Sequence, residues 1–170
     1  QLKWEKVLGD STKSKKILGN GTELIEQNLL INVGENSDGS CFIVWHDTSG
    51  KQVKYFDYHP DSSYVNFFRA FDFLVVDDKS FYLLVYETSV EDGRRTILLH
   101  ADSSGRERWR KPFKAHGASF TVGTSIWQDE DDRIFITGSI DQGIIEYDAN
   151  WQNRIWIMEI DSLGNKLWEY

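Results

Sequence analysis

The chain has 170 residues, of which 40% are hydrophobic and 14% aromatic, and its 19 Lys and Arg against 27 Asp and Glu give a net charge of −8. This composition is ample for one folded domain with a packed core and excludes an intrinsically disordered chain. The basic residues form no continuous stripe, so nucleic acid and anionic membrane surfaces are not expected as partners. No apolar run approaches the roughly 20 residues that a membrane helix requires.

The N-terminal residue and the single cysteine bear on processing. Because the chain begins with Gln1 and not with Met, we expect a processed or excised product from which any signal peptide has been removed. The single cysteine, Cys41, excludes an internal disulfide framework and a cysteine-based zinc site. It lies in the apolar run CFIVW, where a buried, inert thiol is expected. Cysteine usage therefore does not indicate whether the protein lies in an oxidising or a reducing compartment.

Short runs rich in β-branched and aromatic residues alternate with clusters of Gly, Asn, Asp and Ser. There are two prolines and no long stretch with helical periodicity, so the pattern predicts an all-β fold with antiparallel hairpins. In chain order, the clearest predicted strands are 28–34, 40–46, 71–76, 80–86, 95–101, 133–138 and 154–160. The predicted hairpin turns lie at 36–40, 76–80, 91–94 and 129–132.

One phrase, Asp-x-x-Gly-x-x-x-Trp, occurs in full as DSSGRERW and again as DSLGNKLW. A degenerate copy begins at Asp47, where Lys54 stands in place of Trp and Tyr55 is the candidate for the missing ring. We expect the Asp to cap a turn, the Gly to supply a positive φ, and the Trp to fill the space between repeated units. The residues of this structural signature are Asp47, Gly50, Asp102, Gly105, Trp109, Asp161, Gly164 and Trp168.

The phrase recurs at similar intervals, which predicts three four-stranded antiparallel units at approximately 10–58, 59–113 and 114–170, preceded by one closing strand around Trp4. Units of this kind are the blades of β-propellers. Because closed propellers use about four to eight blades, three units predict part of a larger propeller. Closure by a homo-oligomer is the alternative.

The segments IWIMEIDSLGNKLWEY, TILLHADSSGRERWRK and QLKWEKVLGDS resemble the propeller-type repeats of large secreted and cell-surface proteins of Bacteroidota. The resemblance covers essentially the whole chain and departs from the family pattern at Lys54. It implies a secreted or cell-surface location. Quinoprotein repeats place Gly four residues after Asp, whereas Gly follows at three here, so no quinone cofactor is expected.

Titratable residues form no recognisable active-site pattern. His46 and His100 end predicted strands, where a partly buried imidazole is the expected role. His59 and Asp61 could supply a base and an orienting carboxylate, but a polar turn is the favoured interpretation. The acidic run at 129–132 could bind calcium, with a solvated hairpin turn again favoured. We therefore predict no catalytic residue, no metal site and no cofactor.

Two segments are candidates for ligand or partner contacts. The insertion at 139–153 mixes rings and polar groups in a way that suits a sugar face or a protein hot spot, although it could equally pack on its own unit or extend the strands. The segment 58–71 carries rings that could fill the space between units or contact another chain. The candidate contact residues are Tyr147, Asp148, Asn150, Trp151, Tyr64, Phe67 and Phe68.

The predicted function is a non-catalytic β-propeller module of a secreted or surface protein, for protein or glycan binding or for architecture. Its expected partners are the remaining blades, a second copy or a secretion or surface protein, and possible glycans. The alternative is the scaffold portion of a propeller enzyme, such as a glycan-cleaving hydrolase, whose active site lies largely outside this chain.

Overall fold

The computed structural model describes residues 18–25, 29–61, 65–77, 80–90, 93–141 and 153–170, and every regular element among them is a β-strand. The all-β prediction is therefore confirmed. The strands are β1 Leu18–Ile25, β2 Leu29–Glu35, β3 Cys41–His46, β4 Gln52–Tyr58, β5 Val65–Asp77, β6 Ser80–Ser89, β7 Gly93–Asp102, β8 Glu107–Phe113, β9 Phe120–Gln128, β10 Ile134–Asp141, β11 Asn153–Ile160 and β12 Lys166–Glu169.

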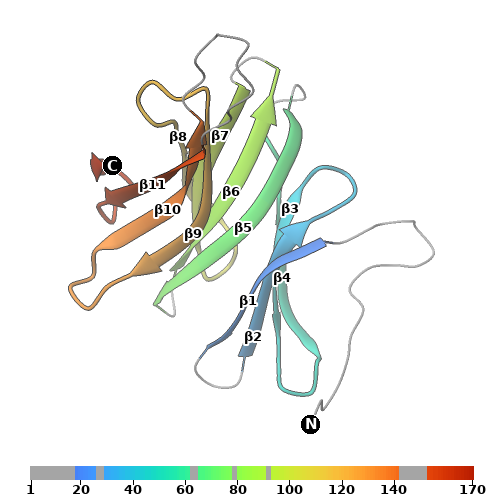
Figure 1. Cartoon of the computed structure of the whole chain (residues 1–170). Coiled ribbons are helices and arrows are strands. Elements are labelled where there is room, and N and C mark those ends of the chain that lie inside the picture. The colour runs from blue at the N-terminus through green and yellow to red at the C-terminus, as the bar shows by residue number, and fades with distance from the viewer. Residues whose placement is uncertain (1–17, 26–28, 62–64, 78–79, 91–92, 142–152) are drawn as a thin grey trace.

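The described strands form three antiparallel meanders of four strands each, which we call the first unit (β1–β4), the second unit (β5–β8) and the third unit (β9–β12). The first unit is a separate sheet. The other two are joined into one eight-stranded sheet by a single parallel pair, Arg94 with Phe120. Figure 1 shows the first unit, in blue, beside the broad sheet that runs from green to red. The sheets that the described strands form are open, with no closed ring of strands.

Each repeated Asp-x-x-Gly phrase forms the same tight turn between the third and fourth strands of its unit. In the turn after β7, Asp102 Oδ1 accepts hydrogen bonds from the backbone N–H groups of Ser104 (2.9 Å) and Arg106 (3.1 Å). Gly105 has a φ of 80°, a conformation that glycine adopts without strain. The turns that begin at Asp47 and Asp161 have the same bonds, with Gly50 and Gly164 at φ 80° and 73°.

The acidic run at 129–132 folds into this turn as well. Asp129 Oδ1 accepts the N–H groups of Asp131 and Arg133, and Asp132 takes the glycine position with a φ of 62°. The second carboxylate oxygen of Asp129 is bound by the guanidinium of Arg133 at 2.6–2.7 Å. Both carboxylate oxygens thus serve the hairpin, as in the favoured interpretation of this run.

The second unit buries both faces of its sheet. On β6, Phe81, Leu83 and Val85 point into a cluster shared with the first unit, whereas Tyr82 and Leu84 point into a cluster shared with the third unit. Side chains alternate between the faces of a strand, so a strand covered on both sides is apolar at every position. This explains why the sequence FYLLVY at the start of β6 shows no polar alternation.

Polar contacts also join the units. Arg69 on β5 donates two hydrogen bonds to the carboxylate of Glu35 on β2, at 2.6 and 2.8 Å. Asp72, also on β5, accepts hydrogen bonds from the hydroxyl of Ser125 (2.8 Å) and the N–H of Ile126 (3.0 Å) on β9. Strand β5, the first strand of the second unit, therefore lies between β2 of the first unit and β9 of the third unit.

Several sequence predictions are changed or left untested by the fold. The expected closing strand around Trp4 lies outside the described residues. β5 begins at Val65, so Phe67 and Phe68 belong to a strand and not to a loop. The ring of Tyr55 stacks on Phe42 within the first unit, which makes the prediction for Tyr55 wrong: strand alternation points it to the opposite face from Phe56, the ring that contacts the second unit.

Candidate binding surface on the third unit

A row of side chains crosses each unit just before its Asp-x-x-Gly turn. In the second unit, β-pairing places Tyr82, His100 and Trp109 opposite one another on three successive strands. In the third unit, the row is made of Trp127, Phe135, Glu159 and Trp168. Directly paired residues on an antiparallel sheet share a face and contact one another. The two rows are therefore structural equivalents, which we call the second-unit row and the third-unit row.

The third unit covers the second-unit row with its Asp-x-x-Gly turn. Gly164 lies so close to the indole of Trp109 that a Cβ built on the glycine would be 2.4 Å from Cη2. The hydroxyl of Tyr82 donates a hydrogen bond to the carbonyl of Ser162 at 2.9 Å. Lys111, next to Trp109 on the same face of β8, donates to the carbonyl of Leu163 at 2.7 Å. The indole of Trp109 and two hydrogen-bond donors, Tyr82 and Lys111, thus hold the turn in place.

The boundary between the first and second units repeats this arrangement. A Cβ on Gly105 would be 2.1 Å from Cδ1 of Phe56, and Lys54 donates to the carbonyl of Ser103 at 3.3 Å. The hydroxyl of Tyr58 donates to the carbonyl of Gly105 at 3.0 Å. Lys54 and Phe56 lie seven and nine residues after Asp47, whereas Trp109 and Lys111 lie seven and nine after Asp102. The ring and the lysine have exchanged places, and both still contact the next turn.

Among the described residues, no turn covers the third-unit row in this way. Trp127 and Trp168 are each 44% exposed, and Tyr170, which follows Trp168 on the same face, is 86% exposed. The rings of the row nevertheless pack against one another. Trp127 stacks on Phe135 with ring centroids 4.4 Å apart, and Phe135 meets Trp168 edge to face at 6.3 Å. Together with Ile155, which is 74% exposed, these rings form an apolar surface on the outer side of the third unit.

Charged groups hold the edges of this surface. The indole N–H of Trp168 donates to the carboxylate of Glu159, its neighbour in the row. The guanidinium of Arg133 lies over the ring of Phe135, 5.7 Å from its centroid. Glu169 lies on the opposite face of β12, where it pairs with Lys166 at 2.9 Å; burial acts to raise the pKa of Glu169, but the hydrogen bonds from Lys166 and Trp156 lower it. The rings are thus held in position before anything binds.

The described part of segment 58–71 contributes to the core and not to this surface. Phe68 is 1% exposed and packs between the first and second units, so it has no surface to offer a partner. Phe67 is partly buried and meets Tyr86 edge to face at 5.8 Å. Tyr64, Tyr147, Asp148, Asn150 and Trp151 lie outside the described residues.

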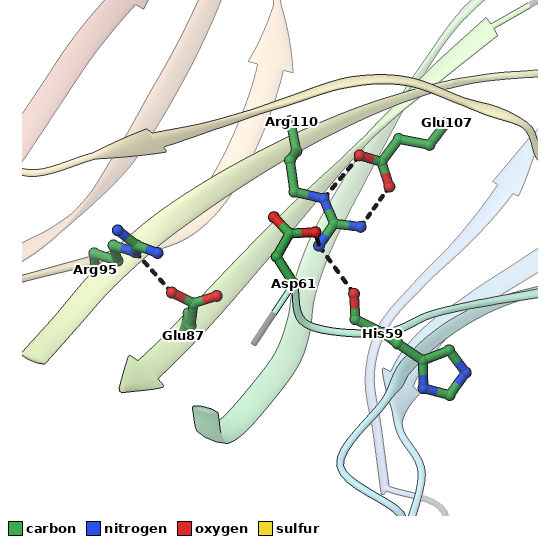
Figure 2. Close-up of polar contacts among 6 residues, drawn as sticks. All are labelled: His59, Asp61, Glu87, Arg95, Glu107 and Arg110. Carbon is green, nitrogen blue, oxygen red and sulfur yellow. Dashed lines mark hydrogen bonds and ion pairs between the residues drawn. The ribbon is translucent and has the colours of Figure 1, made fainter. Parts of the chain in front are cut away.

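The hypothesis of a base and an orienting carboxylate at His59 and Asp61 does not fit the geometry. Figure 2 shows that Arg110 gathers this loop: its guanidinium pairs with Asp61 at 3.1 Å and donates to the backbone carbonyl of His59 at 2.9 Å, while Glu107 binds its other side. The imidazole of His59 lies instead near Asp57, at 3.5 Å, and is 64% exposed. The hydrogen bond that Arg110 donates to Glu107 raises the pKa of Arg110, so Arg110 is a fixed cation whose contacts with Asp61 and His59 tie the loop to β8.

A second pair in Figure 2, Glu87 and Arg95, lies on the neighbouring strands β6 and β7. Arg95 Nε donates to Glu87 at 2.6 Å, and only 5% of the glutamate side chain is exposed. A buried carboxylate paired in this way is expected to be structural. Elsewhere, Cys41 is fully buried, and burial raises the pKa of its thiol well above the usual range. Among the described residues, no three His, Cys, Asp or Glu side chains lie together as a metal site would require.

The sequence did not reveal the third-unit row. Trp168 was identified as part of the repeat, but Trp127 and Phe135 belong to other strands and become its neighbours only through β-pairing. The available signal was an aromatic residue on each side of the acidic turn at 129–132, Trp127 before it and Phe135 after it. It requires the strand register, which sequence alone did not supply.

Comparisons with known proteins agree with the fold class. No protein-family model and no curated protein matches the sequence. Among solved structures, the chain is similar to a D477G ACO/RPE65 chimera in a trigonal crystal form, with a TM-score of 0.50 and 10% identity over 92% of this chain and 39% of that one. It is also similar to the Trp149Ala mutant of Synechocystis apocarotenoid oxygenase, with a TM-score of 0.45 and 11% identity over 79% of this chain and 33% of that one. The chain spans about a third of the length of these structures.

At this level of identity the likeness concerns the fold alone.

Within the part of the chain that the structure describes, no helix is long and apolar enough to cross a membrane.

Proposed function

We propose that this chain is a segment of a β-propeller and acts as a non-catalytic module for protein binding and architecture. The observation that carries the proposal is the repeated contact at both unit boundaries, together with the exposed third-unit row that is equivalent to a covered one. Repeat proteins are built from units that each bury one neighbour's face, and a unit without a neighbour leaves that face open.

The chemistry of the exposed row suits a protein partner. Tryptophan and tyrosine are enriched at the centres of protein interfaces because their rings combine a large apolar area with a polar group. Trp127, Trp168 and Tyr170 present three such side chains on one face, and Trp168 is already oriented by Glu159. An exposed apolar patch that is flanked by charged groups is typical of an interaction site.

The proposal retains two expectations from the sequence. One is a secreted or cell-surface location, which rests on the resemblance to Bacteroidota repeat proteins. The other is a contact to protein or glycan through Tyr147, Asp148, Asn150 and Trp151, which lie in the insertion between β10 and β11.

The experiment is the solution mass of the chain, measured by light scattering over a range of concentrations, with intact mass spectrometry on the same sample. We expect reversible association that strengthens with concentration, because the third-unit row is uncovered. The variant Trp168→Lys should weaken it, since Lys54 shows that a unit accepts lysine at this position. Val90→Lys, at an apolar residue that is 72% exposed in the turn after β6, is the matched control. A chain that stays monomeric throughout, or that associates equally well as the Trp168 variant, contradicts the proposal.

The second candidate is the scaffold portion of a propeller enzyme. The support for it is the likeness in fold to the ACO/RPE65 chimera, at a TM-score of 0.50, in which ACO stands for apocarotenoid oxygenase. Because that likeness concerns fold alone, the binding module remains the principal proposal.

A further inference from the structure

We propose that the third-unit row is the docking site for a further four-stranded β-unit, which seats the glycine of its own Asp-x-x-Gly turn on the indole of Trp168. The inference rests on the proposed function and names the partner of the same surface. It commits to a turn-bearing β-unit as the occupant, and not to a second copy of this chain bound through its own row.

The interface between units is repeated along the chain. The same contact occurs at both boundaries of the chain: a glycine at positive φ lies on a ring of the preceding unit's fourth strand. At the first boundary the pair is Gly105 and Phe56, and at the second it is Gly164 and Trp109. A side chain at either glycine would overlap the ring, so each boundary requires this residue type. Trp168 is the next ring in this series.

Trp168 corresponds to Trp109 in its position within the unit. Trp168 stands seven residues after Asp161, as Trp109 stands seven after Asp102. Each indole is the last member of its row, paired with Glu159 in one case and with His100 in the other. A turn that docks on the third-unit row would therefore meet the same kind of ring, an indole, at the same position of the fourth strand.

The fourth strand of a unit also supplies a hydrogen-bond donor to the docked turn. At the second boundary, Lys111 lies nine residues after Asp102 and donates to a carbonyl of the docked turn. The corresponding residue of the third unit is Tyr170, whose phenol is 86% exposed. Tyr58 shows that a phenol on a fourth strand can do this, because its hydroxyl donates to the carbonyl of Gly105 at 3.0 Å. The surface thus offers both a ring and a donor to the turn's backbone.

The test uses the full chain with a second copy of residues 112–170 attached directly after Tyr170. Pro112 stands ten residues after Asp102, so the attachment continues the strand in register after Tyr170, nine residues after Asp161. The probe is residue-resolved oxidation by hydroxyl radicals, read by mass spectrometry, at a concentration where light scattering reports a monomer. The two copies of Trp168 are distinguishable, because the first lies in a peptide that continues through Tyr170 into Pro112 of the added unit, whereas the second lies in the C-terminal peptide that ends at Tyr170.

We expect the first copy of Trp168 to become as protected as Trp109 in the same sample, while the second copy stays as reactive as Trp168 of the original chain. Gly164→Ala in the added unit alone should remove this protection. Gly117→Ala in the added unit is the matched control, because Gly117 also has a positive φ, 71°, but no atom lies within 4 Å of its Cβ position. That control should leave Trp168 protected.

Three results would overturn the inference. The first is an added unit that gains strand structure by circular dichroism while the first Trp168 stays reactive. The second is an added unit that stays unstructured, since a surface built to receive such a unit should order it. The third is protection of the first Trp168 that persists with Gly164→Ala in the added unit, which would show that the glycine of the turn is not what covers the indole. Each of these leaves the proposed function intact, because that proposal depends on association through the surface and not on a turn.

Discussion

At the scale of single residues, the glycines of the repeated turns carry two separate constraints. Gly39 and Gly164 both have a positive φ, but nothing lies within 4 Å of the Cβ position of Gly39, whereas that of Gly164 overlaps Trp109. Gly39→Ala should therefore cost only backbone strain, about 1–2 kcal/mol. Gly164→Ala adds steric overlap at the unit boundary, which costs typically about 1–3 kcal/mol more. Urea unfolding of both variants measures the difference, and equal losses would show that the ring contact contributes nothing.

The capping aspartates make stability depend on acid. The hydrogen bond from the hydroxyl of Ser104 lowers the pKa of Asp102, and the N–H of Asn165 lowers that of Asp161. A folded-state pKa below the unfolded value of about 3.9 stabilises the fold above that value, and this contribution is lost as pH falls through the folded pKa. We expect the urea midpoint to fall below about pH 4.

Asp102→Asn should make this acid dependence shallower while lowering stability at neutral pH. An amide oxygen can still accept the turn's N–H groups, but it has no charge to titrate or to pair with Arg108. Asp131→Asn, at a carboxylate that is 79% exposed, is the control and should leave the pH profile unchanged. Identical profiles for Asp102→Asn and the original chain would count against the capping role.

At the scale of elements, the fourth strands β8 and β12 have the same ring in two environments. Trp109 is partly buried beneath the turn of the next unit, whereas Trp168 is 44% exposed. Trp109→Ala removes packing at a unit boundary and should cost about 2–4 kcal/mol of unfolding free energy. Trp168→Ala should cost less than about 1 kcal/mol, as is usual for surface substitutions. Denaturant titrations provide both values, and a larger loss at Trp168 would mean that its ring already supports the fold by itself.

At the scale of the whole molecule, the units should be coupled mainly to their immediate neighbours. Cys41 lies fully buried in the cluster that joins the first and second units, so its thiol reports on opening of that boundary. Phe56→Ala, at the same boundary, should accelerate labelling of Cys41 by a thiol reagent more than Trp109→Ala, at the other boundary. Units stacked in a line transmit destabilisation chiefly through shared interfaces. Equal acceleration by the two variants would show that the molecule opens as one cooperative unit.

The sequence by itself determined the all-β class, the Asp-x-x-Gly turns and the repetition of one unit, because each depends on local chemistry. A carboxylate capping its own turn, a glycine at positive φ and a two-residue alternation act within a few positions of the chain. The turn at 129–133 belongs to the same group, although Asp132 replaces the glycine there. Its acidic composition alone fits a calcium site as well as a turn. Only the folded structure shows that the carboxylate of Asp129 pairs with the guanidinium of Arg133.

Tertiary structure alone decided which rings meet and which remain exposed. Phe56 and not Tyr55 contacts the second unit, because strand alternation directs the two rings to opposite faces of β4. Trp109 and Trp168 occupy identical places in the repeat, and the sequence does not distinguish them. They differ because a neighbouring unit covers one and not the other, and burial by a neighbour is a property of the assembled molecule rather than of any stretch of its chain.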